Sequence, residues 1–304
     1  MAEPKPFKTK DEINELIAKA ISSNSGSFSI DQALDGVGVC FLYVGDKTNR
    51  DSILALQQYI FDTIPALDLR FNDREKDIKK AFNEYFGEFI NTGLNQELSI
   101  DKIEAKKQKT IKKIYFGKLF WYSTISPDIE KEEDNNKFCI FIHYLIKSPP
   151  SDEPEWRQSR DIAKKLSMAV GGYDYLFKKS LMNNYFVTLE GMALHGMAGT
   201  TSILPCLGIV YGSIWEELYN LDHRIYEKVR EIPIGTWKKH FSGRGNAKKK
   251  DISELLDLVG FKKRSSDDEN DAIAMAIVAA SNSEALKDTA GRIRPFRKAD
   301  NIEK

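Results

Sequence analysis

Four stretches rich in β-branched and aromatic residues constrain the fold of this chain more than any other feature. They cover residues 28–44, 110–124, 137–147 and 185–194, and such residues favour strands. A Gly-rich segment, LDGVG, interrupts the first stretch, which predicts either two short strands or one long bent strand. Segments with helical patterns accompany these stretches at residues 11–22, 51–94, about 152–179, 201–219, 251–259 and 272–280. The sequence therefore predicts an α/β fold.

The composition is that of an ordinary globular protein. The 304 residues are 41% hydrophobic and 30% charged, unlike disordered or collagen-like chains. The 45 basic and 45 acidic side chains cancel, so total charge neither supports nor excludes a nucleic-acid partner. No apolar stretch is long enough to cross a membrane, and the first residues lack the apolar core of a signal peptide. We therefore expect a cytoplasmic protein without a membrane segment or targeting signal.

The three cysteines indicate a reducing compartment. Cys40, Cys139 and Cys206 are odd in number, far apart in the sequence and surrounded by apolar residues. This pattern is typical of buried, reduced thiols rather than of a disulfide framework.

Four acidic residues stand where packing explains them poorly. Asp31 lies in the first apolar stretch, Glu190 lies in the fourth, and Asp268 and Asp271 begin the last apolar helix. Because Asp268 and Asp271 are three positions apart, both project from one face of that helix. Carboxylate oxygens are the ligands that Mg²⁺ and Mn²⁺ prefer, whereas the scattered His and Cys residues offer no spacing for zinc. The acids are thus candidate ligands of a divalent cation.

Each acid also has a purely structural interpretation. Asp31 could cap the Gly-rich turn, and Asp268 and Asp271 could cap their helix and offset its dipole. Glu190 is harder to explain this way, because a carboxylate inside an apolar strand needs a ligand or a place near the strand end.

Residues 232–250 hold six Lys or Arg residues and no acid. Next to a Gly-rich loop and the aromatic pair Trp237 and Phe241, these cations fit contacts to a nucleic-acid backbone, although an isolated basic run can also be a solvated loop. The candidate DNA-binding residues are Lys238, Arg244, Lys248 and Lys249. We expect the basic tail, with Arg292, Arg294 and Arg297, to be disordered.

The histidines carry less weight. His195 could act as a base or ligand but more often such a residue does neither, and His143 is expected to face solvent or occupy a satisfied core position.

Four segments together resemble the RuvC-type Holliday-junction resolvases of the RNase H-like superfamily. Asp31, followed seven residues later by Gly38, is similar to the family's first strand and the opening of its second. Glu190 in VTLEGMALHG matches the metal-binding Glu of the fourth strand, and DENDAIAMA, with Asp268 and Asp271, resembles the family's last motif. In the basic segment, Trp237 stands at a valine position and the matching residues are Lys238, Gly243, Gly245, Ala247 and Lys249.

The resemblance implies a mixed five-stranded RNase H-like sheet flanked by helices. Its first three strands would be antiparallel, and a helical insertion would lie between the first two. The implied organisation is an N-terminal arm and helix over 1–27, a nuclease domain over 28–44 and 110–285, the insertion over 45–109, and the tail over 286–304.

The resemblance also implies a metal-dependent endonuclease that resolves four-way DNA junctions by paired nicks. Asp31, Glu190, Asp268 and Asp271 would hold two Mg²⁺ ions, for which Mn²⁺ could substitute. Cutting two strands symmetrically requires two sites, so a homodimer is expected.

Two other functions stay open. The chain could be another RNase H-like nuclease, acting on a flap or an RNA:DNA hybrid, or a branched-DNA-binding protein without activity. The segment after Glu190 lacks the basic and aromatic residues expected near a junction point, which leaves the preferred substrate undecided.

Overall fold

The structure is a computed structural model. It describes residues 6–33, 36–46, 49–59, 115–116, 119–122, 137–147, 154–180, 182–191, 203–261, 264, 266–281 and 286.

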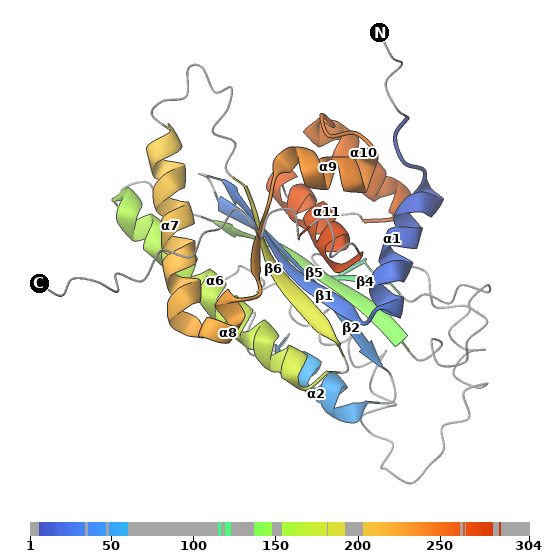
Figure 1. The fold of residues 1–304 in the computed structure, drawn as a ribbon, viewed down its shortest axis with the longest axis horizontal. Coiled ribbons are helices and arrows are strands. Elements are labelled where there is room, and N and C mark those ends of the chain that lie inside the picture. The colour runs from blue at the N-terminus through green and yellow to red at the C-terminus, as the bar shows by residue number, and fades with distance from the viewer. Residues whose placement is uncertain are drawn as a thin grey trace, which may run out of the picture.

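A single mixed sheet forms the centre of the molecule (Figure 1). Its seven strands run in the order β3-β4-β5-β2-β1-β6-β7. The strands are β1 (Ser25–Ala33), β2 (Gly36–Asp46), β3 (Tyr115–Phe116), β4 (Leu119–Tyr122), β5 (Lys137–Lys147), β6 (Asn184–Glu190) and β7 (Val229–Ile232). The strands β1, β2 and β5 are antiparallel, whereas β6 is parallel to β1 and β7 is parallel to β6. The five strands β5-β2-β1-β6-β7 confirm the predicted mixed sheet, in which antiparallel strands come first and parallel strands follow.

Two details differ from the prediction. Among the described residues the sheet has seven strands rather than five, because residues 28–44 belong to two strands and residues 110–124 contribute the short strands β3 and β4, which pair with each other beside β5. Residues 28–44 also form parts of two antiparallel neighbours, β1 and β2, with Ala33 opposite Gly36. The predicted insertion therefore follows the second strand instead of the first. Of this insertion, α2 (Arg50–Gln58) is described, and residues 60–109 lie outside the described residues.

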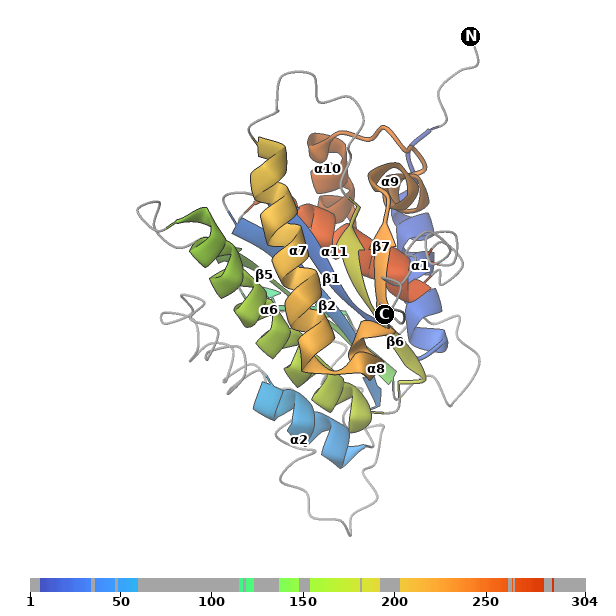
Figure 2. The same ribbon diagram turned by 60° about the vertical axis from the view of Figure 1, so that its left-hand side comes forward.

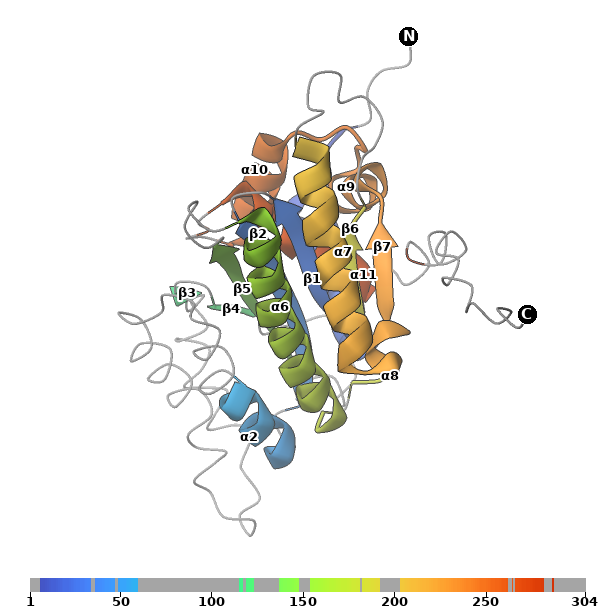
Figure 3. The same cartoon turned by 90° about the vertical axis from the view of Figure 1, so that its left-hand side faces the viewer.

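Helices cover both faces of the sheet (Figures 2 and 3). One face carries α1 (Lys10–Ser22), α9 (Ile234–Ser242), α10 (Lys249–Val259) and α11 (Asp267–Ser281). The other face carries α2, α6 (Glu155–Lys178), α7 (Ile203–Leu221) and α8 (His223–Tyr226). This layered arrangement gives each apolar face of the sheet a partner.

The helix α11 is the most deeply buried element on its face. Every residue from Glu269 to Ser281 is buried, because α11 packs on β1 and β2 and is covered by α1, α9 and α10. Its alanines allow close approach to the sheet, and the Ser27 hydroxyl donates a hydrogen bond of 2.8 Å to the Ala276 carbonyl. The middle of α11 is thereby held against β1.

The N-terminal arm packs on the segment after α9. The Lys8 amide donates to the Ser242 carbonyl at 2.9 Å, and the Arg244 guanidinium lies 4.0 Å from the centre of the Phe7 ring. A capping box between Thr9 and Glu12 then starts α1. The arm and the basic segment, distant in sequence, are therefore neighbours in the fold.

The thiols of Cys40 and Cys139 are buried and free, which agrees with the prediction for those two residues. The side chain of Cys206 lies outside the described residues. Among the helices that the structure describes, none combines the length and apolar character needed to span a bilayer.

Candidate functional site

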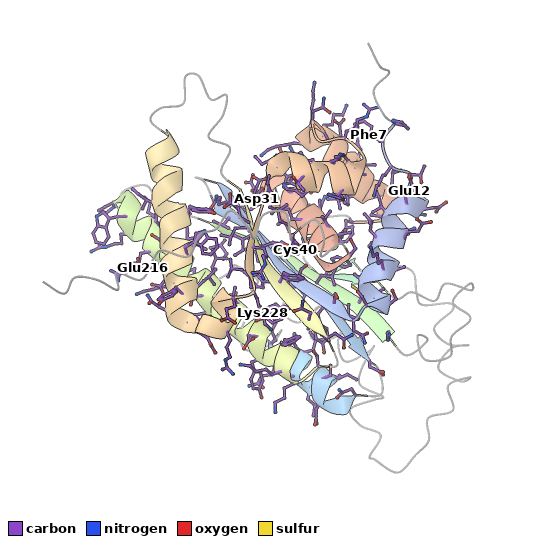
Figure 4. The ribbon with its side chains drawn as sticks, viewed as in Figure 1. Phe7, Glu12, Asp31, Cys40, Glu216 and Lys228 are labelled. Carbon is purple, nitrogen blue, oxygen red and sulfur yellow. The ribbon has the colours of Figure 1, made fainter. Side chains whose placement is uncertain are left out.

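Two of the predicted acids lie where neighbouring parallel strands end. The β1–β6 register places Ile30 beside Leu189. The next residues, Asp31 and Glu190, therefore lie near each other at the same end of the two strands. The hydroxyls of Ser29 and Thr188 are hydrogen-bonded at 2.5 Å. Because side chains alternate along strands, Asp31 and Glu190 share the face of these hydroxyls, which is the face that α11 covers. Figure 4 shows Asp31 at this end of the sheet.

The other two acids come from the first turns of α11, and a glycine explains how this helix reaches the sheet. Gly38 lies directly opposite Asp31 in the β1–β2 hairpin. A Cβ atom at Gly38 would lie 2.2 Å from the Asp268 carbonyl oxygen, a distance that no side chain could accommodate. The Asp31–Gly38 spacing of the sequence therefore has a physical basis: the glycine leaves room for the helix that carries Asp268 and Asp271.

Burial and mutual repulsion raise the pKa values of two of these acids. Burial raises the pKa of Asp31 well above its usual range, and the charges of Glu190 and Asp271 add to this effect. Burial, followed by the charge of Glu190, raises the pKa of Asp271 to about 7, against the opposing influence of Lys238 and Lys249. The four acids thus form one electrostatic cluster.

Two contacts hold acids of this cluster in place. The Trp237 Nε1 donates a hydrogen bond of 2.9 Å to Glu190 Oε1. The Lys249 Nζ lies 3.1 Å from Asp268 Oδ1. Burial lowers the pKa of Lys249, but the hydrogen bond and the charges of the acids outweigh it, so the pKa is raised overall.

The donor chemistry of the cluster fits a divalent cation. Asp271 is only 4% exposed, and its Oδ1 is buried with no hydrogen-bond partner among the described residues. A buried carboxylate oxygen without a donor is costly unless a cation satisfies it, and oxygen donors suit Mg²⁺ or Mn²⁺. In their present rotamers, with Lys249 on Asp268, no three His, Cys, Asp or Glu side chains of the described ranges form a ready ligand set.

The four predicted DNA-binding residues divide into two pairs. Lys238 and Lys249 lie beside the acids, since both lower the pKa of Asp271. Arg244 stacks on Phe7, and Lys248 is exposed at the start of α10. The structure thus brings one pair to the acids and places the other pair in the loop before α10.

The aromatic pair in this segment has a different place from the one predicted. Trp237 and Phe241 are both fully buried, because α9 turns its apolar face towards α11. They belong to the core and are not available to contact a phosphate backbone.

The sequence interpretation missed the role of Glu269. This residue is fully buried between the two acids of α11 and pairs through Oε1 with His143 Nδ1 of β5. The pair fastens the first turn of α11 to the antiparallel half of the sheet. His143 thus occupies a buried position with a polar partner, which is one of the two alternatives stated for it in the sequence analysis. For Glu269, the signal in the sequence is its place between the candidate ligands Asp268 and Asp271.

Several predicted features lie outside the described residues. These are His195, most of the segment that follows Glu190, and the basic tail.

Comparisons with known proteins return matches only among solved structures. No family model matches the chain, and no curated protein matches it. The structure of Thermus thermophilus RuvC is similar at 11% identity and a TM-score of 0.40, covering 85% of this chain and 95% of that one. The T. thermophilus RuvC in complex with a Holliday junction substrate is similar at the same identity and TM-score, covering 88% and 96%. The assignment of the fold rests on the strand order and directions described above.

Proposed function

We propose that this protein is a metal-dependent endonuclease of the RuvC type, which resolves four-way DNA junctions by paired nicks. The observation that carries the proposal is the cluster of Asp31, Glu190, Asp268 and Asp271 with cations beside it. Structural caps would not need to converge from two strand ends and a helix, nor would they leave a buried carboxylate oxygen without a donor.

The four acids would hold two Mg²⁺ or Mn²⁺ ions. When bound, such ions activate a water molecule and stabilise the leaving oxygen of a phosphodiester. The protein's own contribution is a buried, preorganised set of carboxylates. Because the pKa values of Asp31 and Asp271 are raised, cation binding would release protons from the site.

The cations of α9, α10 and the loop between them would hold the DNA backbone. Lys238 and Lys249 lie beside the acids, where the phosphate to be cleaved would sit, and Arg244 and Lys248 extend the basic surface. Backbone contacts of this kind bind any sequence and weaken with added salt. Paired nicking of a junction would need two sites, so the proposal includes a homodimer.

The test is a cleavage assay on a labelled synthetic four-way junction beside linear duplex, flap and RNA:DNA hybrid, with Mg²⁺ or EDTA. We expect paired nicks on the junction only when Mg²⁺ is present. Metal-dependent cutting of only the flap or the hybrid would identify another RNase H-like nuclease. Binding of the junction without any cutting would identify a DNA-binding protein without activity.

The acids are tested with substitutions that keep their shape. We expect Asp31→Asn, Glu190→Gln and Asp271→Asn to abolish cleavage and to leave salt-sensitive junction binding in place. Full activity in one of these variants would remove that residue from the site. The matched control is Asp267→Asn, because Asp267 is an exposed acid in the same turn of α11.

A further inference from the structure

Trp237 is a buried aromatic residue with a polar contact at the acid cluster. Its ring is fully buried on the inner face of α9, and its Nε1 donates to Glu190 Oε1 at 2.9 Å. An indole N–H can only donate, so it can pair with a carboxylate oxygen but never compete with one for a cation.

The surrounding packing fixes the direction of this hydrogen bond. The helix α9 begins after Pro233, which directly follows β7, and ends at Gly243, whose φ is +87°. Within it, Trp237 and Phe241 are one turn apart and both fully buried. The indole therefore cannot swing away from Glu190 without displacing the core.

Glu190 needs such a contact because of its position. It is the last residue of β6 and is only partly buried, so the strand fixes its backbone but leaves its side chain able to adopt several rotamers. The hydrogen bond from Trp237 restricts this side chain.

We propose that Trp237 is a positioning residue, which orients the carboxylate of Glu190 for cation binding. This inference rests on the proposed function, in which Glu190 is a metal ligand. The same helix carries Lys238, whose charge acts on Asp271. The helix α9 thus orients Glu190 through Trp237 and places the charge of Lys238, the next residue, near Asp271.

The hydrogen bond itself is tested by NMR of the protein labelled with ¹⁵N in its tryptophans. The chain has four tryptophans. The indole signal of Trp237 is the one that is missing in Trp237→Phe, or the one that remains after the other three signals are assigned with Trp121→Phe, Trp156→Phe and Trp215→Phe. We expect Glu190→Gln to shift the Trp237 Nε1–H signal, because the charged acceptor becomes neutral, and to leave the signal of the 55% exposed Trp156 in place.

The positioning role is tested by calorimetric titration of wild type and Trp237→Phe with MnCl₂. Phe keeps most of the ring and removes the donor. We expect Mn²⁺ affinity and the rate of junction cleavage each to fall by about 10- to 100-fold, the usual effect of removing a residue that orients a metal ligand. The control Trp156→Phe should match wild type in both measurements, and circular dichroism checks that each variant is folded.

The outcomes separate this inference from the proposed function. An unshifted Trp237 signal in Glu190→Gln, or a folded Trp237→Phe with wild-type Mn²⁺ affinity and cleavage rate, would overturn the positioning role. If Trp237→Phe does not fold, the Glu190→Gln spectrum decides alone, since that variant leaves the core intact. A wild-type protein that binds no Mn²⁺ and cuts no branched DNA would overturn the proposed function even if the indole signal shifts.

Discussion

The carboxylate of Asp271 links the chemistry of the site to the stability of the fold. Its pKa of about 7 exceeds the usual value of an aspartate in an unfolded chain, so between pH 4 and 7 the native state binds a proton that the unfolded state has lost. Protonation therefore favours folding, and stability falls as pH rises through this window. Asp31, whose pKa is also raised, acts in the same direction.

Replacing Asp271 by Asn should remove its share of this pH dependence. In EDTA, we expect the free energy of unfolding of wild type to decline relative to that of Asp271→Asn by at most about 4 kcal/mol between pH 4 and 8. Urea unfolding at both pH values measures the difference, and Mg²⁺ should restore wild-type stability mainly at pH 8. Equal pH dependence in the two proteins would show that Asp271 is not held in a protonated, buried state.

The element that matters most for the site is α11, whose position depends on the absence of a side chain in β2. We expect Gly38→Ala to destabilise the protein by about 2–4 kcal/mol, because its Cβ would strike the Asp268 backbone and move the helix. Cleavage should be lost as well. Gly171→Ala is the control, since its Cβ would meet only Leu221 at 3.4 Å and alanine favours the helix. Thermal unfolding of both variants compares them, and a stable, active Gly38→Ala would contradict this account of the spacing.

A second contact on α11 is the buried His143–Glu269 pair. We expect His143→Leu to cost about 3–5 kcal/mol, because Glu269 would lose a partner in the core. The double variant His143→Leu with Glu269→Leu should recover much of that loss, since apolar side chains can replace a buried pair. Denaturant unfolding of wild type, the two single variants and the double variant gives a double-mutant cycle. If the losses of stability in the single variants add up to the loss in the double variant, the two side chains are not coupled.

At the scale of the whole molecule, charge is balanced overall but unevenly distributed. The basic segment adjoins the acid cluster, so DNA would be drawn to the face of the sheet that carries α9, α10 and α11. Lys248 is exposed there, whereas Lys164 of α6 is exposed on the opposite face.

We expect Lys248→Ala to weaken junction binding at low salt and to lower the slope of log affinity against log salt by about 1, as one phosphate contact is lost. Lys164→Ala should leave both quantities unchanged. Fluorescence anisotropy over a salt series measures them, and a Lys248→Ala slope equal to that of wild type would place this residue away from the DNA.

Strand segments and buried acids could be predicted from the sequence because they depend on local pattern. Asp31 and Glu190 stand out as charges in apolar stretches, whereas the Gly-rich segment is compatible with two short strands or with one bent strand. Contacts between distant segments could not be predicted this way. The packing of Phe7 on Arg244 and the hydrogen bond from Trp237 to Glu190 depend on tertiary arrangement, and Trp237 in a basic segment was therefore interpreted as a surface residue.

The central place of α11 has a consequence for the synthesis of the protein. This helix follows every strand of the sheet in the chain, yet it fills the middle of one layer and carries Asp268 and Asp271. While a nascent chain emerges from the ribosome, the part of β1 and β2 that α11 covers stays exposed until α11 arrives. Two of the four acids are also missing until then. A growing chain is thus unable to bring the four acids together until α11 has packed on the sheet.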